Sequence, residues 1–514
     1  MKLMVILLLI IVIKTGNCAR ILGIFPLPAR SHYILGSSLM RGLAEKGHDV
    51  TVISPFGETT PCKNGSYKDI ILTDFIKVND KKHFDLFEID KMDFVTYGLM
   101  MNYLGNDNVE KTLSHPNVQK LLKSNEKFDI VIVEQFVNDA LKAFSYYYKA
   151  PLVLFVTFSS NAWINPLVAN PAPPSYIPEQ KIDFDHKNFF HRLKNNIIYV
   201  FGELNRNLLF FPAQNKIMKK YFPDAPDLDN ILYNASLVLL NSHISTNKAV
   251  PRVPSMIDIG GFHLKPPKKL PQGLQEFLDN AKEGVVYFSM GSALQSVNLP
   301  IEKREALLKV FSRLKEKVLW KWEDDVLPGQ PSNVKLEKWL PQQDILAHPN
   351  IKAFITHGGL LSLIESVYHG VPILAIPVFG DQVTNAMEAT WNGCGRYILY
   401  SELNEKKLEE SLKDILGNSK YRENMQRRSK IMHDRQNKPI DDADYWIQYV
   451  IRHRGATHLR VAGLDLPWYQ YLSLDVYLFI CSVTFLVFYV IYNSIKFLIS
   501  FFRKNESKEK VKKH

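Results

Sequence analysis

Cysteine is scarce in this chain, with 4 among its 514 residues. Cys18 ends an apolar leader and Cys481 lies in a long apolar run, which leaves Cys62 and Cys394 in the body between them. Two thiols in different predicted domains cannot provide the disulfide framework of a small secreted protein, whether or not they pair. Low-complexity tracts are also missing, and 46% apolar with 22% charged residues is typical of globular domains.

The body of the chain lacks a concentrated charge of either sign. The formal net charge is +11, but seven basic and only two acidic residues lie from Lys496 onward, and Lys2 and Lys14 stand near the other end. The excess that remains is spread over the rest of the chain. Binding to nucleic acid needs a localised basic field, so we expect no nucleic acid among the partners.

Both ends of the chain have the pattern of a membrane protein. Met1–Cys18 combines Lys2, the apolar run Leu3–Ile13 and small residues before a cleavage point after Cys18, which is typical of a secretory signal. Val476–Ile495 carries no charge and is about long enough to span a bilayer, and the basic residues after it favour a cytosolic tail. We therefore predict a type I membrane protein with a lumenal body. A buried core helix is the alternative for Val476–Ile495.

Between the two ends, apolar strands alternate with helices in two similar halves. The first half has predicted strands at Arg20–Phe25, Asp49–Ser54, Phe128–Val133, Pro151–Thr157 and Ser236–Leu240, and a helix from His32 to about Lys46. A stiff basic linker, Lys265–Pro271, precedes a second half that starts with a strand at Val285–Ser289, and Pro439–Arg454 is a late helix that can cross back. This order predicts two parallel sheets, with ligands in the cleft at the carboxyl ends of the strands.

The stretch Trp339–Gln382 carries the most specific pattern in the chain. It predicts a strand at Ile351–Thr356, a glycine turn at His357-Gly358-Gly359, a helix at Ser362–His369, a strand at Ile373–Ile376 and a polar loop that ends in Asp381-Gln382. A strand that passes through a glycine turn into a helix directs free backbone N–H groups and the positive end of the helix dipole at one point. The stretch therefore predicts a phosphate-binding site.

This stretch resembles the signature segment of the UDP-glycosyltransferase superfamily, which includes the membrane-bound UDP-glucuronosyltransferases. The resemblance rests on Trp339, Gln342, His357, Gly359, Ser362, Glu365, Asp381 and Gln382, and it extends with gaps from about Arg20 to the C-terminus. It implies an α/β fold of the GT-B type, with two Rossmann-like domains, a cleft between them and one C-terminal transmembrane helix. The expected layout is a signal peptide (1–18), an N-terminal acceptor-binding domain (19–262), a linker (263–283), a C-terminal UDP-sugar-binding domain (284–438), a return helix with a pre-membrane segment (439–475), a transmembrane helix (476–495) and a basic tail (496–514).

The resemblance assigns the donor residues. It implies that Trp339 stacks on uracil, that Gln342 binds the nucleoside, that Ser292, His357, Gly358, Gly359 and Ser362 hold the diphosphate, that Glu365 binds ribose, and that Asp381 and Gln382 hold the sugar. Preorganised N–H donors stabilise the charge on departing UDP, so no metal and no other cofactor is expected beside the UDP-sugar co-substrate. Core packing is the alternative for Trp339, a capping box for Ser362-x-x-Glu365 and a solvated turn for Asp381-Gln382.

A catalytic base is expected at the start of the first helix. Ser31-His32 follows a strand and a proline-containing loop, and a neutral imidazole can accept a hydroxyl proton at neutral pH. The family has its catalytic histidine at the matching Ser-His, whereas a capping or surface histidine is the alternative among 15 histidines. A carboxylate should orient His32. The family usually has an aspartate directly after the third strand, where this chain has Glu134, and Asp139 is the other candidate.

Three other functions fit parts of the sequence. A metal-dependent GT-A enzyme would use an Asp-x-Asp motif, and Asp183-Phe-Asp185 and Asp227-Leu-Asp229 have that form, but neither follows a strand of a nucleotide-binding unit. An inactive membrane-tethered protein that binds lipophiles would not need His32 or the Asp381-Gln382 pair. A membrane-anchor subunit would not need both halves.

The leading hypothesis is an inverting hexosyltransferase that acts on a hydroxyl of a small lipophilic acceptor. The sequence looks closest to the insect-type branch, in which UDP-glucose is the usual donor, and UDP-glucuronate is the alternative. Lysines at −3 and −5, Lys512 and Lys510, resemble a dilysine signal for the endoplasmic reticulum, beside the alternative of a basic tail that touches anionic lipid. The sequons at Asn64 and Asn234 predict lumenal glycosylation. The acceptor's identity and a homo-oligomeric state stay open.

Overall fold

A computed structural model describes residues 18–58, 60–75, 85–179 and 184–512. The predicted signal peptide, apart from Cys18, and Asp183 of one Asp-x-Asp motif lie outside the described residues. The chain divides into two compact units, one up to Leu459 and the other from Arg460 onward.

A seven-stranded parallel sheet forms the centre of the N-terminal half. Its strands are β1 (Arg20–Ile24), β2 (Asp49–Ser54), β3 (Ser66–Ile71), β4 (Ile130–Glu134), β5 (Leu152–Val156), β6 (Ala235–Leu240) and β7 (Met256–Asp258), in the order β3-β2-β1-β4-β5-β6-β7. Every residue of β4 and β5 is buried, as expected for a parallel sheet covered on both faces. The sheet order changes direction beside β1, so the loops after β1 and β4 lie next to each other at its carboxyl edge.

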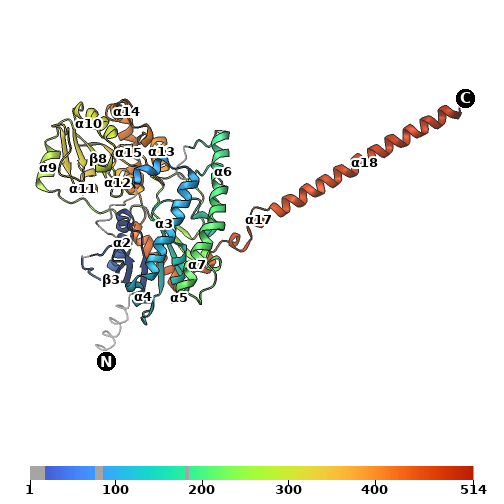
Figure 1. Cartoon of the computed structure of the whole chain (residues 1–514), viewed down its shortest axis with the longest axis horizontal. Helices are drawn as coiled ribbons and strands as arrows, with labels where there is room; N and C mark the ends of the chain where they lie inside the picture. Colours follow the sequence, from blue (N-terminus) through green and yellow to red (C-terminus); the bar gives the residue numbers. More distant parts are fainter. Residues whose placement is uncertain (1–17, 59, 76–84, 180–183, 513–514) are drawn as a thin grey trace. The chain divides into compact units, whose positions relative to one another are not determined.

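Helices cover this sheet. They are α2 (Arg30–Glu45), α3 (Phe94–Ser114), α4 (Pro116–Leu122), α5 (Ala143–Tyr148), α6 (Phe189–Asn205), the π-helical segment η4 (Arg206–Phe210), α7 (Phe211–Tyr221) and α8 (Leu228–Leu232). Figure 1 shows α3 (light blue) beside α6 (green), and the Nδ2 of Asn102 donates a hydrogen bond of 2.8 Å from α3 to Asn205 Oδ1 on α6. Helix α2 begins at Arg30, two residues before the predicted start.

The second half contains a six-stranded parallel sheet. Its strands are β8 (Val285–Ser289), β9 (Lys317–Lys321), β10 (Val334–Glu337), β11 (Ile351–Thr356), β12 (Ile373–Ala375) and β13 (Gly395–Tyr397), in the order β10-β9-β8-β11-β12-β13. Helices α10 (Ile301–Ser312), α11 (Gln342–Leu346), α12 (Leu360–His369), α13 (Gln382–Trp391), α14 (Glu405–Gly417) and α15 (Ser419–His433) accompany it. This is the strand order of a Rossmann-like sheet, and the direction change falls between β8 and β11.

The two halves are connected twice. The segment predicted as a linker contains a helix, α9 (Gln272–Asp279), with irregular chain before and after it. Helix α16 (Pro439–Arg452) returns to the first half, where Ala443, Ile447 and Val450 are buried in the core beneath the first sheet. An ion pair of 2.7 Å between His48 Nε2 and Asp444 Oδ1 fastens it there.

The second compact unit ends in one long helix, α18 (Leu474–Lys512), after the short α17 (Trp468–Tyr471). An 18-residue window within its part Leu474–Arg503 has a mean hydropathy of 2.2, and this part is long and apolar enough to cross a membrane. At 1.5 Å per residue this part is about 45 Å long, which exceeds the hydrocarbon core of a bilayer. The predicted span Val476–Ile495 lies inside it, and the predicted tail does not begin a new element, because the same helix continues to Lys512.

Candidate active site

Two glycine turns meet at the carboxyl edge of the second sheet. Gly291 follows β8 and Gly358 follows β11, with φ of 85° and 82°, a region that residues with a Cβ rarely adopt. The ring of His357 lies between the turns, and a Cβ at Gly291 would come within 2.5 Å of His357 Cε1. A Cβ at Gly359 would lie 2.5 Å from His357 Nε2. The predicted diphosphate residues, with Ser292 next to Gly291, are therefore brought together around one imidazole.

His357 is held in its neutral form. Burial and, to a smaller extent, the positive charge of Lys321 together lower its pKa to about 4. A neutral imidazole can still donate one N–H to a phosphate oxygen. Lys321 was missed in the sequence: it is the last residue of β9, it is buried, and its Nζ forms an ion pair of 2.6 Å with Glu323. The signal that would have found it is a basic residue that ends a strand beside the glycine turn.

Helix α12 begins at Leu360 rather than at Ser362, and its N-cap is Gly359, which has no side chain to cap with. Ser362 therefore lies inside the helix, and the capping box is not formed. Instead, Gln342 at the start of α11 donates its Nε2 hydrogens to Ser362 Oγ (3.0 Å) and to Glu365 Oε2 (2.5 Å). Tyr287 donates its hydroxyl to Gln342 Oε1 (3.1 Å). The predicted nucleoside and ribose residues thus belong to one hydrogen-bonded network.

The carboxyl group of Glu365 is buried. Burial raises its pKa to about 7 against the opposing effect of the hydrogen bonds from Gln342 and Gln343. His263, at the start of the linker, lies with its Nε2 3.9 Å from Glu365 Oε1. Neither ring nitrogen of His263 has a hydrogen-bond partner among the described residues, and burial lowers its pKa to about 3. The site thus contains a buried acid and a buried neutral histidine side by side.

Trp339 is not packed in the core, since 57% of it is exposed. The guanidinium of Arg30, from the first half, lies 5.5 Å from the centre of the Trp339 ring, and Lys321 Nζ lies 5.8 Å from it. An exposed indole at this edge offers a face on which a nucleobase can stack.

Asp381 and Gln382 lie where the loop after β12 enters α13. Asn385 donates to Asp381 Oδ2 (2.7 Å), so Asp381 is tied to its own helix and is not a free solvated turn residue. Gln382 is buried, and its Oε1 accepts from the backbone N–H groups of Val378 (2.8 Å) and Phe379 (3.1 Å). Among the described residues its Nε2 has no partner, so its two hydrogens are available to a ligand.

His32 and Glu134 form a close pair across the first sheet. His32 lies in the first turn of α2, after β1, and Glu134 is the last residue of β4, so both stand at the carboxyl edge. His32 Nδ1 lies 2.5 Å from Glu134 Oε1 and 3.4 Å from Thr157 Oγ1. Glu134 is only 1% exposed, and its Oε2 has no hydrogen-bond partner among the described residues.

Asp139 has a different environment. It is buried, and its Oδ1 accepts from Lys142 Nζ (2.7 Å) and from Gln135 Nε2 (2.9 Å). Lys142 is fully buried and has one further acceptor, the carbonyl oxygen of Leu232 at 3.3 Å. The Asp139 carboxylate therefore neutralises a buried lysine and is not the carboxylate that contacts His32.

The two halves come together beside Asp381 and His32. Burial raises the pKa of Asp381, and the nearby His32 lowers it, so the two residues are close enough to interact electrostatically. Asp381 in turn adds to the effect of burial that raises the pKa of Tyr97 on α3. His32, from the first half, thus lies near Asp381, the residue that the resemblance assigns to the sugar.

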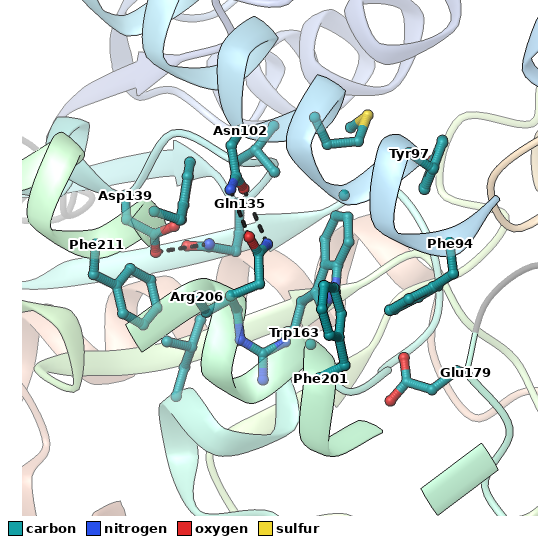
Figure 2. A pocket seen from close by; sticks show the side chains of 17 residues that line it. Phe94, Tyr97, Asn102, Gln135, Asp139, Trp163, Glu179, Phe201, Arg206 and Phe211 are labelled. Atoms are coloured by element: carbon teal, nitrogen blue, oxygen red, sulfur yellow. Dashed lines mark hydrogen bonds between the residues drawn. The ribbon is translucent and has the colours of Figure 1, made fainter. Parts of the chain in front are cut away.

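A pocket opens in the first half beside this point. Figure 2 shows its aromatic walls, with Trp163 and Phe201 at the centre of the view. The lining residues include Phe94, Tyr97, Met101, Asn102, Gln135, Asp139, Trp163, Glu179, Phe201, Asn205, Arg206, Phe210 and Phe211. They come from α3, the loop after β4, two loops and the α6–η4–α7 segment. From the sequence, the aromatic segment that contains Phe210 and Phe211 is expected to form helices beside an acceptor cleft, and Asp139 is named in another role; the other lining residues were not predicted individually.

Other predicted features fall outside this site. Asn64 and Asn234 are exposed. Cys62 and Cys394 are free thiols. Asp227, of the other Asp-x-Asp motif, lies before α8 and pairs with Lys219 at 3.3 Å.

Sequence comparison places the chain among known transferases. Residues 24–509 match the family model "UDP-glucoronosyl and UDP-glucosyl transferase". UDP-glycosyltransferase UGT5 of Dactylopius coccus is 39% identical over 93% of this chain and 91% of its own length. UDP-glucosyltransferase 2 of the same organism is 35% identical over 100% and 99%. UDP-glucuronosyltransferase 2B13 of Oryctolagus cuniculus is 30% identical over 93% and 92%.

Solved structures match the fold. A UDP-glucose:anthocyanidin 3-O-glucosyltransferase in complex with UDP has a TM-score of 0.57 and 18% identity, and the match covers 84% of this chain and 99% of that one. The calicheamicin glycosyltransferase CalG4 has a TM-score of 0.56 and 16% identity, with 85% and 99% covered. The predicted GT-B arrangement of two Rossmann-like domains is confirmed.

Proposed function

The chain belongs to the UDP-glucuronosyl and UDP-glucosyl transferase family, and we propose that it is an active, inverting hexosyltransferase in which His32 is the general base. The observation that carries this proposal is the contact of 2.5 Å between His32 Nδ1 and Glu134 Oε1. Glu134 is buried, and His32 is its hydrogen-bond partner among the described residues, which is the expected arrangement for a carboxylate that orients a base.

The reaction follows from this arrangement. With Nδ1 donating its hydrogen to Glu134, Nε2 of His32 is the free acceptor and takes the proton of the acceptor hydroxyl. The hydroxyl oxygen forms a bond to the anomeric carbon from the side opposite the diphosphate. The bond between that carbon and the β-phosphate oxygen breaks, and UDP leaves with the electron pair. The configuration at the anomeric carbon is therefore inverted.

The donor side stabilises the leaving group and holds the sugar. Backbone N–H groups of the turns at Gly291 and Gly358, together with neutral His357, suit the charge that grows on the β-phosphate. Trp339 provides a face for uracil, and the network around Glu365 provides acceptors for the ribose hydroxyls. Asp381 and the free Nε2 of Gln382 suit sugar hydroxyls. We propose that these groups act without a metal, so turnover should not change when a chelator is added.

For the sugar, we favour UDP-glucose over UDP-glucuronate. Relatives named as UDP-glucosyltransferase and as UDP-glucuronosyltransferase both match this chain, and the first of these is the more similar. A carboxylate on the sugar would need a cation beside Asp381, whereas the described residues around Asp381 and Gln382 offer hydrogen-bond donors and acceptors for neutral hydroxyls. The acceptor is proposed to be a small lipophilic alcohol or phenol.

We also propose that the protein is a type I protein of the endoplasmic reticulum membrane. The helix Leu474–Arg503 supports a single span, and the exposed Asn64 and Asn234 are compatible with lumenal glycosylation. Loss of an endoglycosidase-sensitive mass when both asparagines are replaced by glutamine would test the lumenal orientation.

The experiment that tests the function uses membranes that contain the full chain, incubated with UDP-glucose or UDP-glucuronate and a panel of phenols. We expect glucosides from UDP-glucose and much less product from UDP-glucuronate. Product from UDP-glucuronate alone would overturn the proposed donor. UDP-sugar binding without any transfer would overturn the enzyme function and favour a lipophile-binding protein.

A further inference from the structure

The pocket in the first half contains one acidic group that the proposed chemistry does not use. Glu179 lies in its wall, and only 9% of this residue is exposed. In Figure 2, Glu179 lies at the lower right, below Phe94 and Phe201, apart from the Gln135–Asp139 pair at the left. Its backbone N–H is bound to Asn195 Oδ1 (2.8 Å), which fixes the residue in place and leaves the carboxyl group to the pocket.

The other charged and amide side chains of the pocket each have at least one partner, although the buried Oε1 of Gln135 has none among the described residues. Gln135 donates to Asp139, which also binds Lys142. Asn102 and Asn205 donate to each other at 2.8 and 3.3 Å. Arg206 forms an ion pair with Glu203 one turn earlier in the helix. By contrast, the carboxyl group of Glu179 has no hydrogen-bond partner in the part of the chain that the structure describes.

A buried polar group without a partner is costly, because it has lost its water and gained nothing in return. Burial raises the pKa of Glu179 to about 7, opposed by the positive charge of Arg206 and helped by the negative charge of Glu203, so the uncharged form, which loses less on burial, is well populated near neutral pH. A ligand group that hydrogen-bonds to this carboxyl would remove the remaining cost. A hydroxyl suits both protonation states, since it can donate to a carboxylate and accept from a carboxylic acid.

We infer that Glu179 is a specificity-determining residue of the acceptor pocket, which selects aromatic acceptors that carry a second hydroxyl besides the one that reacts. Phe94, Trp163 and Phe201 provide flat apolar walls for the ring, and Glu179 provides a hydrogen-bonding point among them. The inference rests on the proposed function, because it assumes that this pocket holds the acceptor. It adds a feature of the acceptor that the transfer chemistry alone does not require.

The test compares two acceptors of one shape, 1-naphthol and 1,5-dihydroxynaphthalene, with UDP-glucose as donor. One extra hydrogen bond to a buried carboxyl should raise kcat/KM by about tenfold for the diol, after correction for its two equivalent hydroxyls. In Glu179→Leu this preference should vanish, while 1-naphthol is turned over as well as before or better. Glu179→Gln, whose amide also hydrogen-bonds, should keep most of the preference.

Asp107→Asn is the matched control, because it removes a negative charge from α3, which also lines the pocket, while neither Asp107 nor its ion-pair partner Lys111 is a pocket residue, and it should leave the preference unchanged. Unchanged binding of UDP-glucose shows that each variant is folded. Equal preference in the wild type and in Glu179→Leu, or an equal loss for both naphthols, would overturn the inference.

The same two acceptors distinguish a failure of the inference from a failure of the proposed function. Their dissociation constants are measured from naphthol fluorescence, which needs no turnover. If the wild type makes no glucoside at all, the transferase function fails. The ratio of the two dissociation constants in the wild type and in Glu179→Leu then decides whether Glu179 selects the second hydroxyl.

Discussion

The proposed donor site and the proposed acceptor pocket of this molecule are built in different ways. The proposed donor residues come almost entirely from one stretch, Trp339–Gln382, in which strand, glycine turn and helix follow one another directly. The proposed acceptor pocket is assembled from α3, the loop after β4, two further loops and the α6–η4–α7 segment. A site that local chain geometry creates can be read from sequence, whereas a pocket that arises from packing of distant helices cannot. His32 and Glu134 are intermediate between these two cases. His32 lies in α2, which follows β1, and Glu134 is the last residue of the neighbouring strand β4.

The largest expected effect separates catalysis from donor binding. Replacing His32 by alanine removes the proposed base, and transfer should fall by about 10²- to 10⁴-fold. Binding of UDP-glucose, measured by calorimetry, should change little because the donor groups lie in the other half. His453→Ala, at an exposed histidine after α16, is the control and should keep full activity. A fully active His32→Ala protein would contradict the assignment of His32 as the general base.

The two acids of the acceptor side should respond in opposite ways. Glu134→Gln keeps the shape but loses the charge that orients His32, so kcat should fall by about 10²-fold with normal thermal stability. Asp139→Asn instead leaves Lys142 buried without a counter-charge, so the free energy of unfolding should fall by about 3 kcal/mol. The molecules that remain folded should keep the wild-type kcat. Urea unfolding and activity at low temperature measure the two effects. The reverse pattern would make Asp139 the orienting carboxylate.

A change at Trp339 should affect only the donor side. Loss of stacking on uracil in Trp339→Ala should raise KM for UDP-glucose about tenfold or more and leave acceptor KM unchanged. Trp391→Ala is the matched control, since Trp391 is also exposed and lies in α13 of the same half, beneath Lys248. A rise in the acceptor KM with an unchanged donor KM would indicate that Trp339 contacts the acceptor and not UDP-glucose, and would contradict this prediction.

The smallest effect concerns pH. Burial raises the pKa of Glu365 to about 7, and ribose hydroxyls donate to the ionised carboxylate more strongly than to the acid. Affinity for UDP-glucose, whose diphosphate does not titrate near neutrality, should therefore increase about five- to tenfold between about pH 6 and pH 8.

His263 and His357, with pKa values of about 3 and 4, stay neutral over this range and should not contribute. Titration calorimetry in Glu365→Gln should show a flat profile. An equal slope in this variant, or affinity that falls with pH, would contradict the role of Glu365.

The elements around the donor were predictable because their signals are local. The strands at Asp49–Ser54, Val285–Ser289 and Ile351–Thr356 have the predicted bounds, since each is an apolar run that ends at a turn or polar residue. The start of α12 was predicted two residues late, because Ser362 resembles an N-cap while the chain turns at Gly359 instead. The hydrogen bonds from Gln342 that draw Ser362 and Glu365 together are tertiary and leave no local trace.

The acceptor side shows what sequence patterns leave out. The resemblance favoured Glu134 over Asp139 by its position, but Asp139 stayed open as the alternative, and only the fold gives Asp139 a buried lysine as partner. Lys321, His263 and Glu179 each gain their importance from burial beside another group. A polar residue in an ordinary position becomes notable only once the packing around it is known.

The central claim is that the hydroxyl activated by His32 and the departing UDP are on opposite faces of the anomeric carbon. The stereochemistry of transfer tests this claim most directly. Purified full-length protein is given UDP-glucose, which is α-linked, and 1-naphthol, and the first product is examined by proton NMR before it can equilibrate. We predict the β-glucoside, formed far more slowly by His32→Ala. An α-glucoside would contradict the account.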